Sequence, residues 1–250
     1  MKNYFDFTGK KYLITGASSG IGKATAILLA ENGAQLVLNG RNEDKLKETL
    51  HDLSGTGHMI LAANLNEYQD MTELFKIMIS DEKKLDGLVH SAGIVKNYPL
   101  QALNRDGYEE VTDINLYSFM ELIRLFSKKK YHETNGSIVG VSSIAAVMPD
   151  RGQAIYAASK AGMNAIVYTY AKELITKNIR INTIMPGMVK TPVYHNLVEE
   201  ITQEGADAVT NCQLLGIIEP EAVAETILFL LSDSSRAITG RALYVDAGTL

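Results

Sequence analysis

The sequence predicts an α/β protein, built as a doubly wound parallel sheet of about seven strands with helices on both faces. Short apolar runs alternate with longer amphipathic runs along the whole chain. Parallel strands need crossover connections, and helices packed on both sheet faces supply them. With 250 residues, 46% of them hydrophobic, the chain can bury such a sheet in a single domain over 1–250.

The elements follow from these runs in order. Strands are expected near 11–15, 35–39, 58–63, 85–90, 137–142, 180–184 and 242–246. Helices are expected near 20–32, 42–51, 67–80, 107–130, 154–176 and 219–232. The stretch 186–215 has little periodicity and contains Gly187, Pro192 and Gly205, so we expect it to form a lid over a cleft.

Composition excludes several classes of protein. A formal charge of −5 disfavours a nucleic-acid binder, although Lys128–Lys130 is a local basic run. Cys212 is the only cysteine, which excludes an intrachain disulfide and a cysteine metal cluster, and we expect no metal site. Residues 1–10 lack the apolar core of a signal peptide, and no run reaches the roughly 18 apolar residues that span a bilayer. These features predict a cytoplasmic protein without membrane contacts.

Tyr156 and Lys160 lie in an expected helix, one turn apart on the same face. A nearby ammonium stabilises a phenolate, which lowers the pKa of the phenol toward neutral pH and suits it to proton transfer. Ser143, thirteen residues before Tyr156, would add a hydroxyl that polarises a carbonyl. The alternative is a tyrosine–lysine pair on a solvated helix face.

A second motif follows the first expected strand. Gly16 permits a tight turn, Gly20 lets the backbone approach a pyrophosphate, and Gly22 allows close packing of helix and strand. Free N–H groups at the start of the next helix would receive the phosphates. This context favours a dinucleotide site over a turn without a ligand.

Together these motifs resemble the short-chain dehydrogenase/reductase family, over nearly the whole chain. The matching residues are TGASSGIG at 15–22, HSAG at 90–93, Asn115, Ser143, Tyr156, Lys160 and PG at 186–187. The resemblance implies a Rossmann-type fold and the catalytic residues Asn115, Ser143, Tyr156 and Lys160. Besides Tyr156 and Lys160, it implies as cofactor-binding residues Gly16, Ser18, Ser19, Gly20, Ile21, Gly22, Arg41, Asn64, Leu65, Ser91, Ala92, Gly93, Pro186, Gly187, Val189 and Thr191.

The resemblance also implies roles for the catalytic residues. Ser143 would polarise a substrate carbonyl, with Ser142 as the competing hydroxyl, and Tyr156 would protonate the developing alkoxide. Lys160 would hold the nicotinamide ribose and lower the pKa of Tyr156. Asn115 would fix a water that connects Lys160 to solvent, or would simply satisfy backbone groups inside a helix.

Cofactor choice is expected to be set after the second strand. Gly40 stands where members of the family that prefer NAD usually carry an aspartate, and Arg41 follows with a guanidinium suited to a phosphate. NADP(H) is therefore favoured over NAD(H), and a solvated Arg41 in an ordinary turn is the alternative. Two motifs depart from the family pattern. Asn64-Leu65 stands where the family commonly has Asp-Val or Asp-Leu, and His90-Ser91 stands where it usually has Asn-Asn, with His90 expected to be a structural hydrogen-bonding residue.

The substrate stays open. The stretch Gly152–Tyr156 resembles bacterial 3-oxoacyl-(acyl-carrier-protein) reductases, and Lys128–Lys130, Lys177 and Arg180 would offer a basic surface to an acidic carrier. An apolar pocket would be lined by Val95, Tyr98, Met148, Met188 and Tyr194. The alternatives are another small ketone or alcohol (a sugar, steroid or polyol) and a non-catalytic NADPH-binding sensor. The C-terminal Asp246-Ala247-Gly248 implies, by resemblance, a homotetramer, with a homodimer as the smaller option.

Overall fold

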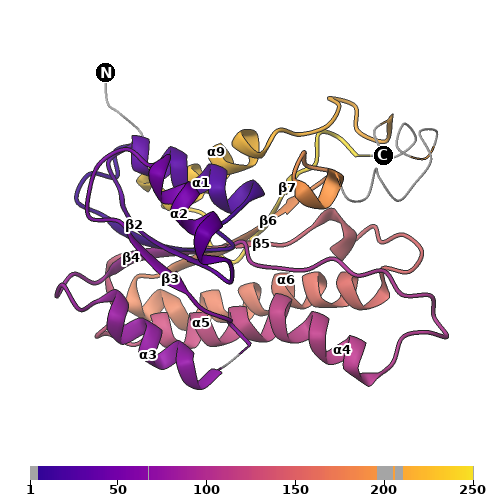
Figure 1. The fold of residues 1–250 in the computed structure, drawn as a ribbon, viewed down its shortest axis with the longest axis horizontal. Coiled ribbons are helices and arrows are strands. Elements are labelled where there is room, and N and C mark those ends of the chain that lie inside the picture. Colours follow the sequence, from indigo (N-terminus) through magenta and orange to yellow (C-terminus); the bar gives the residue numbers. More distant parts are fainter. Residues whose placement is uncertain (1–4, 67, 196–204, 206–210, 250) are drawn as a thin grey trace.

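The structure, a computed structural model, describes residues 5–66, 68–195, 205 and 211–249 (Figure 1). Its strands form one parallel sheet in the order β3-β2-β1-β4-β5-β6-β7. The strands are β1 (Lys11–Thr15), β2 (Gln35–Gly40), β3 (Met59–Ala62), β4 (Leu85–His90), β5 (His132–Val141), β6 (Arg180–Pro186) and β7 (Ala242–Val245). The predicted doubly wound parallel sheet is thereby confirmed.

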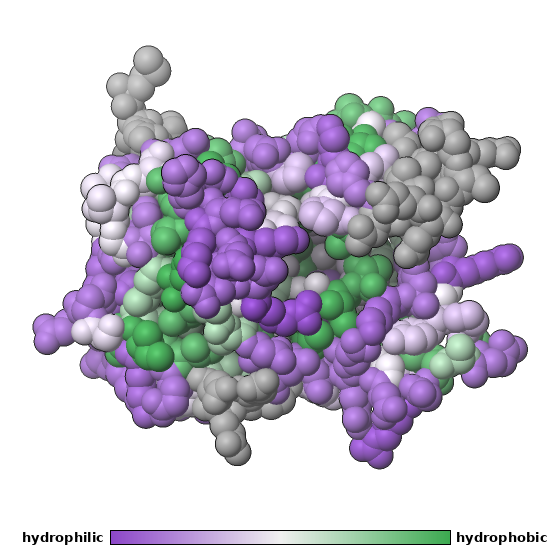
Figure 2. Space-filling view, viewed as in Figure 1, coloured by the Kyte–Doolittle hydropathy of each residue, from purple (hydrophilic) through white to green (hydrophobic). Residues whose placement is uncertain are grey.

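Helices cover both faces of this sheet. They are α1 (Gly20–Glu31), α2 (Glu43–His51), α3 (Tyr68–Met78), α4 (Arg105–Thr112), a π-helical turn (Asp113–Tyr117), α5 (Ser118–Phe126), α6 (Ala154–Leu174) and α9 (Pro220–Leu231). In Figure 1, α1, α2 and α9 lie above the sheet, and α3, α4, α5 and α6 lie below it. Figure 2 shows a mostly hydrophilic face on which apolar surface is visible between these two helical layers. Among the described residues, no helix combines the length and apolar character needed to cross a membrane.

Side chains point alternately to the two faces of the sheet, and this divides the core into two clusters, one on each face. On β1, Leu13 belongs to the cluster below the sheet, together with Val167 of α6. Ile14, the next residue, belongs to the cluster above the sheet with Leu29 of α1 and Ile227 of α9. Successive side chains of a strand point to opposite faces, so a strand that is buried along its whole length, as β1 is, fits a sheet covered on both sides.

Two elements differ from the predicted ranges. The helix expected at 107–130 ends at Phe126 and is interrupted by the π-helical turn at 113–117. Strand β5 begins at His132, five residues before the predicted start at 137, and its pairing with β4 shifts register between Leu85 and Gly87. The early part of β5 reads His-Glu-Thr-Asn-Gly, which carries no apolar signal.

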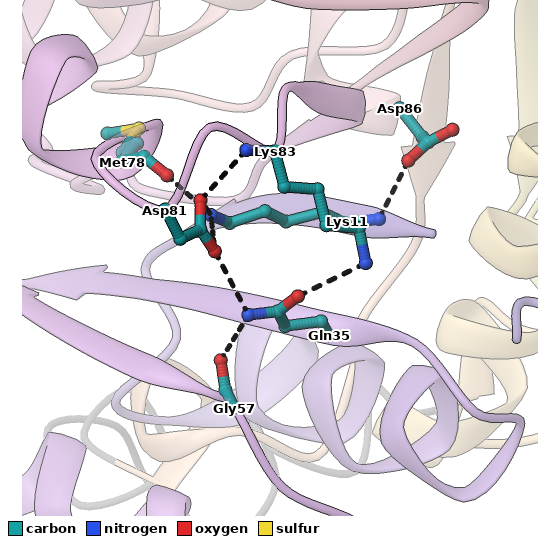
Figure 3. A network of polar contacts seen from close by, with 7 residues as sticks. All are labelled: Lys11, Gln35, Gly57, Met78, Asp81, Lys83 and Asp86. Atoms are coloured by element: carbon teal, nitrogen blue, oxygen red, sulfur yellow. Dashed lines mark hydrogen bonds and ion pairs between the residues drawn. The ribbon is translucent and has the colours of Figure 1, made fainter. Parts of the chain in front are cut away.

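A buried lysine holds the amino ends of the strands together (Figure 3). Lys11, only 1% exposed, donates from Nζ to the Met78 carbonyl oxygen at the end of α3 (2.5 Å) and to Asp81 (2.8 Å). Its backbone N–H donates to Asp86 Oδ2 (2.8 Å), while the amide of Gln35 on β2 donates to the Gly57 carbonyl (2.6 Å). The network therefore joins β1, β2 and β4 at the edge opposite the glycine turn.

Candidate active site

The glycine turn after β1 is packed too closely for side chains. Gly16 has φ +67°, and a Cβ there would lie 2.7 Å from the Ala92 backbone nitrogen. Gly20 has φ +52°, and its Cβ would lie 2.9 Å from Thr191 Cγ2. Segments that follow β1, β4 and β6 therefore meet at one place, the carboxyl edge of the sheet, where ligands bind in such folds.

The start of α1 is suited to an anion. Ser19 is its N-cap with extended backbone (φ −168°), and its side chain makes no capping hydrogen bond. A Cβ at Gly22 would collide with the Gly16 carbonyl group, which keeps helix and turn in contact. The first N–H groups of a helix lack intrahelical partners and favour a bound phosphate. Ser18 and Ile21 flank this cradle, so the residues present fit the pyrophosphate of a dinucleotide.

Three catalytic candidates converge at the same edge. Ser143 follows β5, and its hydroxyl lies near enough to the phenol of Tyr156 on α6 to favour a lower pKa of that phenol. Ser143 Oγ also accepts from the Ala145 backbone N–H (3.1 Å). The neighbouring Ser142 is buried and donates its hydroxyl to the Lys160 carbonyl (3.0 Å). Of the two serines, Ser143 therefore has the hydroxyl that faces the phenol.

Lys160 lies behind Tyr156 in a buried setting. Its Nζ donates to the Val141 carbonyl (2.7 Å) and is 5.9 Å from the centroid of the Tyr156 ring. Burial lowers the pKa of Lys160 to about 8. Burial raises the pKa of Tyr156 above its ordinary value, and the nearby Ser143 hydroxyl opposes that rise. The expected lowering of the Tyr156 pKa by Lys160 stays a prediction.

Asn115 lies within the π-helical turn and is fully buried. Its Oδ1 accepts from the Ile94 N–H (2.8 Å), and its Nδ2 donates to the Ile94 carbonyl (3.0 Å) and to Ser159 Oγ (3.1 Å). A Cβ at Gly93 would lie 3.1 Å from Asn115 Oδ1 and 3.4 Å from Lys160 Nζ. Both amide donors are engaged with protein groups, so the side chain positions the Gly93-Ile94 backbone beside Lys160.

His90, at the end of β4, forms a buried chain of hydrogen bonds. Its Nδ1 is 3.0 Å from Thr15 Oγ1, its Nε2 is 3.5 Å from Ser118 Oγ, and its ring stacks on Phe119. Thr15 Oγ1 in turn accepts from the Ala92 N–H (3.2 Å). Burial, assisted by the charge of Lys160, lowers the pKa of His90 to about 3 and keeps the ring neutral. This geometry fits a structural hydrogen-bonding residue.

The adenosine part of the cofactor is expected at the ends of β2 and β3. Arg41 is exposed and makes no ion pair with any described residue. Asn42 caps α2 by accepting from the Lys45 N–H (3.0 Å). After β3, Asn64 is exposed and accepts from the Asn66 N–H, while Leu65 is buried. A free guanidinium at this corner fits a phosphate group.

The segment after β6 completes the cleft. Gly187 N–H donates to the Val245 carbonyl (3.1 Å), and Thr191 N–H donates to the Val189 carbonyl (2.8 Å). Pro186, Gly187, Val189 and Thr191 therefore lie where the cofactor-binding segment was expected. Of the expected lid at 186–215, residues 196–204 and 206–210 lie outside the described residues.

The mouth of the cleft carries apolar side chains and a shallow cavity. Val95 and Met148 are exposed after β4 and β5, whereas the Tyr194 ring packs edge-on against His195. A cavity of about 320 Å³ lies between two loops. A hydrogen bond from the Tyr98 N–H to the Gly152 carbonyl (2.9 Å) joins these loops. The cavity is lined by Asn97, Tyr98, Pro99, Arg151 and Gly152.

Two of these contacts were missing from the sequence analysis. Ser159, the partner of Asn115, lies between Tyr156 and Lys160, but the motif assigns it no role. Gln213 is one of several polar residues in an irregular stretch, and only its burial in the folded chain distinguishes it. The sequence carried no signal for either residue.

Comparison with known proteins agrees with this geometry. A family model described as enoyl-(acyl carrier protein) reductase matches residues 16–249. The chain belongs to the short-chain dehydrogenase/reductase family. It is 34% identical over 242 residues to a 3-oxoacyl-(acyl-carrier-protein) reductase of Thermotoga maritima, covering 96% of this chain and 97% of the relative. It is 36% identical to a glucose 1-dehydrogenase of Gluconobacter oxydans, covering 97% and 92%.

A solved structure of a short-chain type dehydrogenase/reductase from Mycobacterium ulcerans superposes with a TM-score of 0.88 at 30% identity, covering 97% of this chain and 90% of that one. This short-chain dehydrogenase/reductase is therefore an oxidoreductase that acts on CH–OH or carbonyl groups with a nicotinamide cofactor.

Proposed function

We propose that this short-chain dehydrogenase/reductase reduces a ketone to a secondary alcohol with NADPH. The observation that carries the proposal is the convergence of Ser143 and Tyr156 at one edge of the sheet, with the ammonium of Lys160 buried 5.9 Å from the centroid of the Tyr156 ring. A protein that only binds the cofactor has no use for this arrangement. The sensor alternative is therefore the weaker one.

In the proposed mechanism, a bound nicotinamide supplies the hydride to the carbonyl carbon. Ser143 donates a hydrogen bond to the carbonyl oxygen, and Tyr156 Oη transfers its proton to that oxygen as negative charge develops. Lys160 stabilises the phenolate left behind, since an ammonium favours the charged form of a neighbouring acid. Asn115 holds the Gly93-Ile94 backbone against Lys160 and so fixes the ammonium.

Arg41 supports the choice of NADPH. Its exposed guanidinium has no ionic partner among the described residues, and no acidic side chain stands at Gly40 to repel a 2′-phosphate. We extend the same proposal to the rest of the cofactor set, with the pyrophosphate at Ser18–Gly22 and the nicotinamide beside Gly187–Thr191. The stretch 186–215 is retained as a proposed lid over the cleft.

For the substrate we propose a 3-oxoacyl thioester. The relative from Thermotoga maritima is a 3-oxoacyl-(acyl-carrier-protein) reductase, and the exposed apolar side chains Val95, Val147 and Met148 suit an acyl chain. A sugar or polyol is the alternative, because the relative from Gluconobacter oxydans is a glucose 1-dehydrogenase.

The basic surface expected to receive an acidic carrier requires a correction. Arg180 is turned inward, where its guanidinium donates to the Leu230 carbonyl (2.8 Å) and Ser235 Oγ (2.9 Å) at the end of α9. Lys177 lies beyond the far end of α6 from Tyr156 and donates to the Ser127 carbonyl. Helix α6 has 21 residues, so at about 1.5 Å per residue its ends are about 30 Å apart. A carrier bound at Lys128–Lys130 and Lys177 would therefore lie far from the same subunit's Tyr156.

A homotetramer or homodimer remains our proposal for the assembly. Leu214 and Leu215 are 68% and 86% exposed, and the Leu215 N–H donates to the Ala247 carbonyl in the C-terminal turn that the family resemblance assigns to an interface. Large exposed leucines beside such a turn support burial by a second copy.

The experiment that tests the proposed function compares initial rates of NADPH and NADH oxidation by the purified protein. An acetoacetyl thioester is assayed beside a panel of free ketones and sugars. Faster oxidation of NADPH with the thioester supports both the cofactor and the substrate class. Turnover confined to a sugar or another ketone would retain the chemistry and reject the thioester, and binding of NADPH without any turnover would favour the sensor.

A further inference from the structure

A buried glutamine joins three separate segments next to the expected nicotinamide site. Gln213 is only 6% exposed. Its Oε1 accepts from the Met188 N–H, while its Nε2 donates to the Gly216 carbonyl (2.7 Å) and to the Met188 carbonyl (3.3 Å). One side chain thus satisfies both backbone groups of Met188, a residue that lies between the two expected cofactor residues Gly187 and Val189.

Backbone contacts extend this junction on either side. The Ile218 N–H donates to the Met188 carbonyl (3.1 Å), and the Lys190 N–H donates to the Ile218 carbonyl (2.9 Å). Val189 and Ile218 form a parallel bridge, and Gln213 forms an antiparallel bridge with Thr249 near the C-terminus. The segment after β6, the segment 213–218 and the C-terminal turn are thereby fixed to one another.

Steric constraints at Gly187 depend on the same side chain. A Cβ at Gly187 would collide with Gln213 Oε1 and would lie 3.0 Å from the Asp246 carbonyl oxygen. Gly187 is therefore required because Gln213 and the C-terminal turn come so close to its backbone. The amide leaves this stretch of backbone little freedom to shift relative to the sheet.

We propose that Gln213 is a positioning residue that holds the Gly187–Lys190 backbone in the conformation that receives the nicotinamide end of the cofactor. The inference rests on the proposed cofactor site, since Gly187, Val189 and Thr191 belong to that set. Removing the amide would leave the buried Met188 N–H without its partner, and this segment would then rearrange. The loss would appear in cofactor affinity before it appeared in the chemistry of Tyr156.

The test uses Gln213→Met, an apolar side chain of similar length, and Gln213→Glu, which retains the acceptor for Met188 N–H but loses both donors. Asn182→Leu is the matched control, because Asn182 is equally buried and also joins backbone segments, donating to Ile238 O (3.0 Å) and accepting from Arg241 N–H (3.1 Å). Asn182 lies within β6, away from the cofactor segment.

Two readouts separate positioning from general stability, namely the Kd for NADPH and the amide hydrogen exchange of residues 187–190. Gln213→Met should raise the Kd about tenfold or more and speed the exchange, because unpaired buried backbone groups cost on the order of a factor of ten in an equilibrium. Asn182→Leu should lower overall stability while leaving the Kd and this local exchange near wild-type values.

Gln213→Glu adds a test based on pH. A carboxylate that faces two carbonyl oxygens is unfavourable, whereas the protonated acid can donate one hydrogen bond and still accept from Met188 N–H. NADPH affinity relative to wild type should therefore recover as the pH falls from about 8 to about 6, over which a buried acid with a raised pKa gains its proton. If Gln213→Met does not fold, Gln213→Glu still tests the proposal.

The proposal would be overturned if both Gln213 variants kept the wild-type Kd for NADPH and the wild-type exchange at residues 187–190. It would also be overturned if Asn182→Leu changed the Kd and this exchange as much as the Gln213 variants do. The outcome is distinguishable from failure of the proposed function. A wild type that binds NADPH but reduces no carbonyl would refute the ketone reductase while leaving the comparison of Kd values intact. If the wild type bound no NADPH, that result would refute the cofactor site and with it this role of Gln213.

Discussion

Lys160 is a buried ammonium that donates to the Val141 backbone carbonyl, and its burial makes the free energy of unfolding depend on pH. Burial lowers its pKa from 10.5 to about 8 in the folded protein. Between these values the unfolded chain binds more protons than the folded one, so the free energy of unfolding rises with pH. We predict a slope of up to about 1.4 kcal/mol per pH unit from this group between pH 8 and 10.5.

Urea unfolding of wild type and Lys160→Met across that range measures the slope. The variant should lose it, whereas Lys172→Met, which removes an exposed lysine of the same helix, should keep it. Parallel curves for wild type and Lys160→Met would show that Lys160 is not perturbed.

Arg41 should discriminate between the two nicotinamide cofactors. We predict that Arg41→Ala raises the Kd for NADPH about tenfold or more, because hydrogen bonds to charged groups contribute about 1.5–3 kcal/mol. The Kd for NADH, which lacks the 2′-phosphate, should stay unchanged. Isothermal titration with both cofactors measures this, and Lys45→Ala, an exposed cation of the neighbouring α2, is the control. Equal weakening of both cofactors by Arg41→Ala would contradict phosphate recognition.

At the scale of elements, the Lys11 network fixes the start of β1 to the turn between α3 and β4 (Figure 3). Asp81→Ala leaves a buried ammonium without its carboxylate. Because Asp81 is 44% exposed, water can replace part of the interaction, so we predict a loss of about 1–3 kcal/mol in the free energy of unfolding.

Chemical denaturation measures that loss, with Glu73→Gln as the control because its ion pair with Lys76 is exposed on both sides. The control should change stability by less than about 0.5 kcal/mol. Affinity for NADPH should be unaffected by Asp81→Ala, since the network lies at the sheet edge opposite the glycine turn. A stable Asp81→Ala protein would show that Lys11 needs no carboxylate.

The sequence predicted elements well where local pattern decides them. Each strand was located because parallel strands buried on both faces carry short apolar runs, as Tyr12–Ile14 does within β1. The π-helical turn around Asn115 was missed, because one extra residue per turn leaves the apolar periodicity of a long helix almost intact. The beginning of β5 was missed because pairing with neighbouring strands, and not apolar character, makes it a strand.

Part of the candidate site was likewise predicted from local motifs, whereas another part depends on contacts between distant segments. The glycine turn, Ser143, Tyr156 and Lys160 were located by motif, and the structure brings them to one edge of the sheet. The inward turn of Arg180 toward α9 and the contacts of Gln213 depend on segments that are distant in sequence, so no local pattern announces them. For the same reason the raised pKa of Tyr156 required knowledge of its burial.

For the whole molecule, the two edges of the sheet carry different properties. The carboxyl edge gathers Gly16, Ser143, Tyr156 and the segment after β6, while the amino edge carries Lys11 with its partners and Lys177. Changes at the amino edge should therefore alter stability, and changes at the carboxyl edge should alter cofactor binding and chemistry.

The most direct test is the rate of NADPH oxidation by wild type and Tyr156→Phe with whichever carbonyl of the substrate panel the wild type turns over, measured together with the Kd for NADPH. We predict that the variant loses about 10²- to 10⁴-fold in kcat while the Kd stays within about twofold, since the phenol donates a proton in the reaction and only its hydroxyl is removed. A Tyr156→Phe protein that reduces the carbonyl at the wild-type rate would contradict the proposed catalytic role of Tyr156.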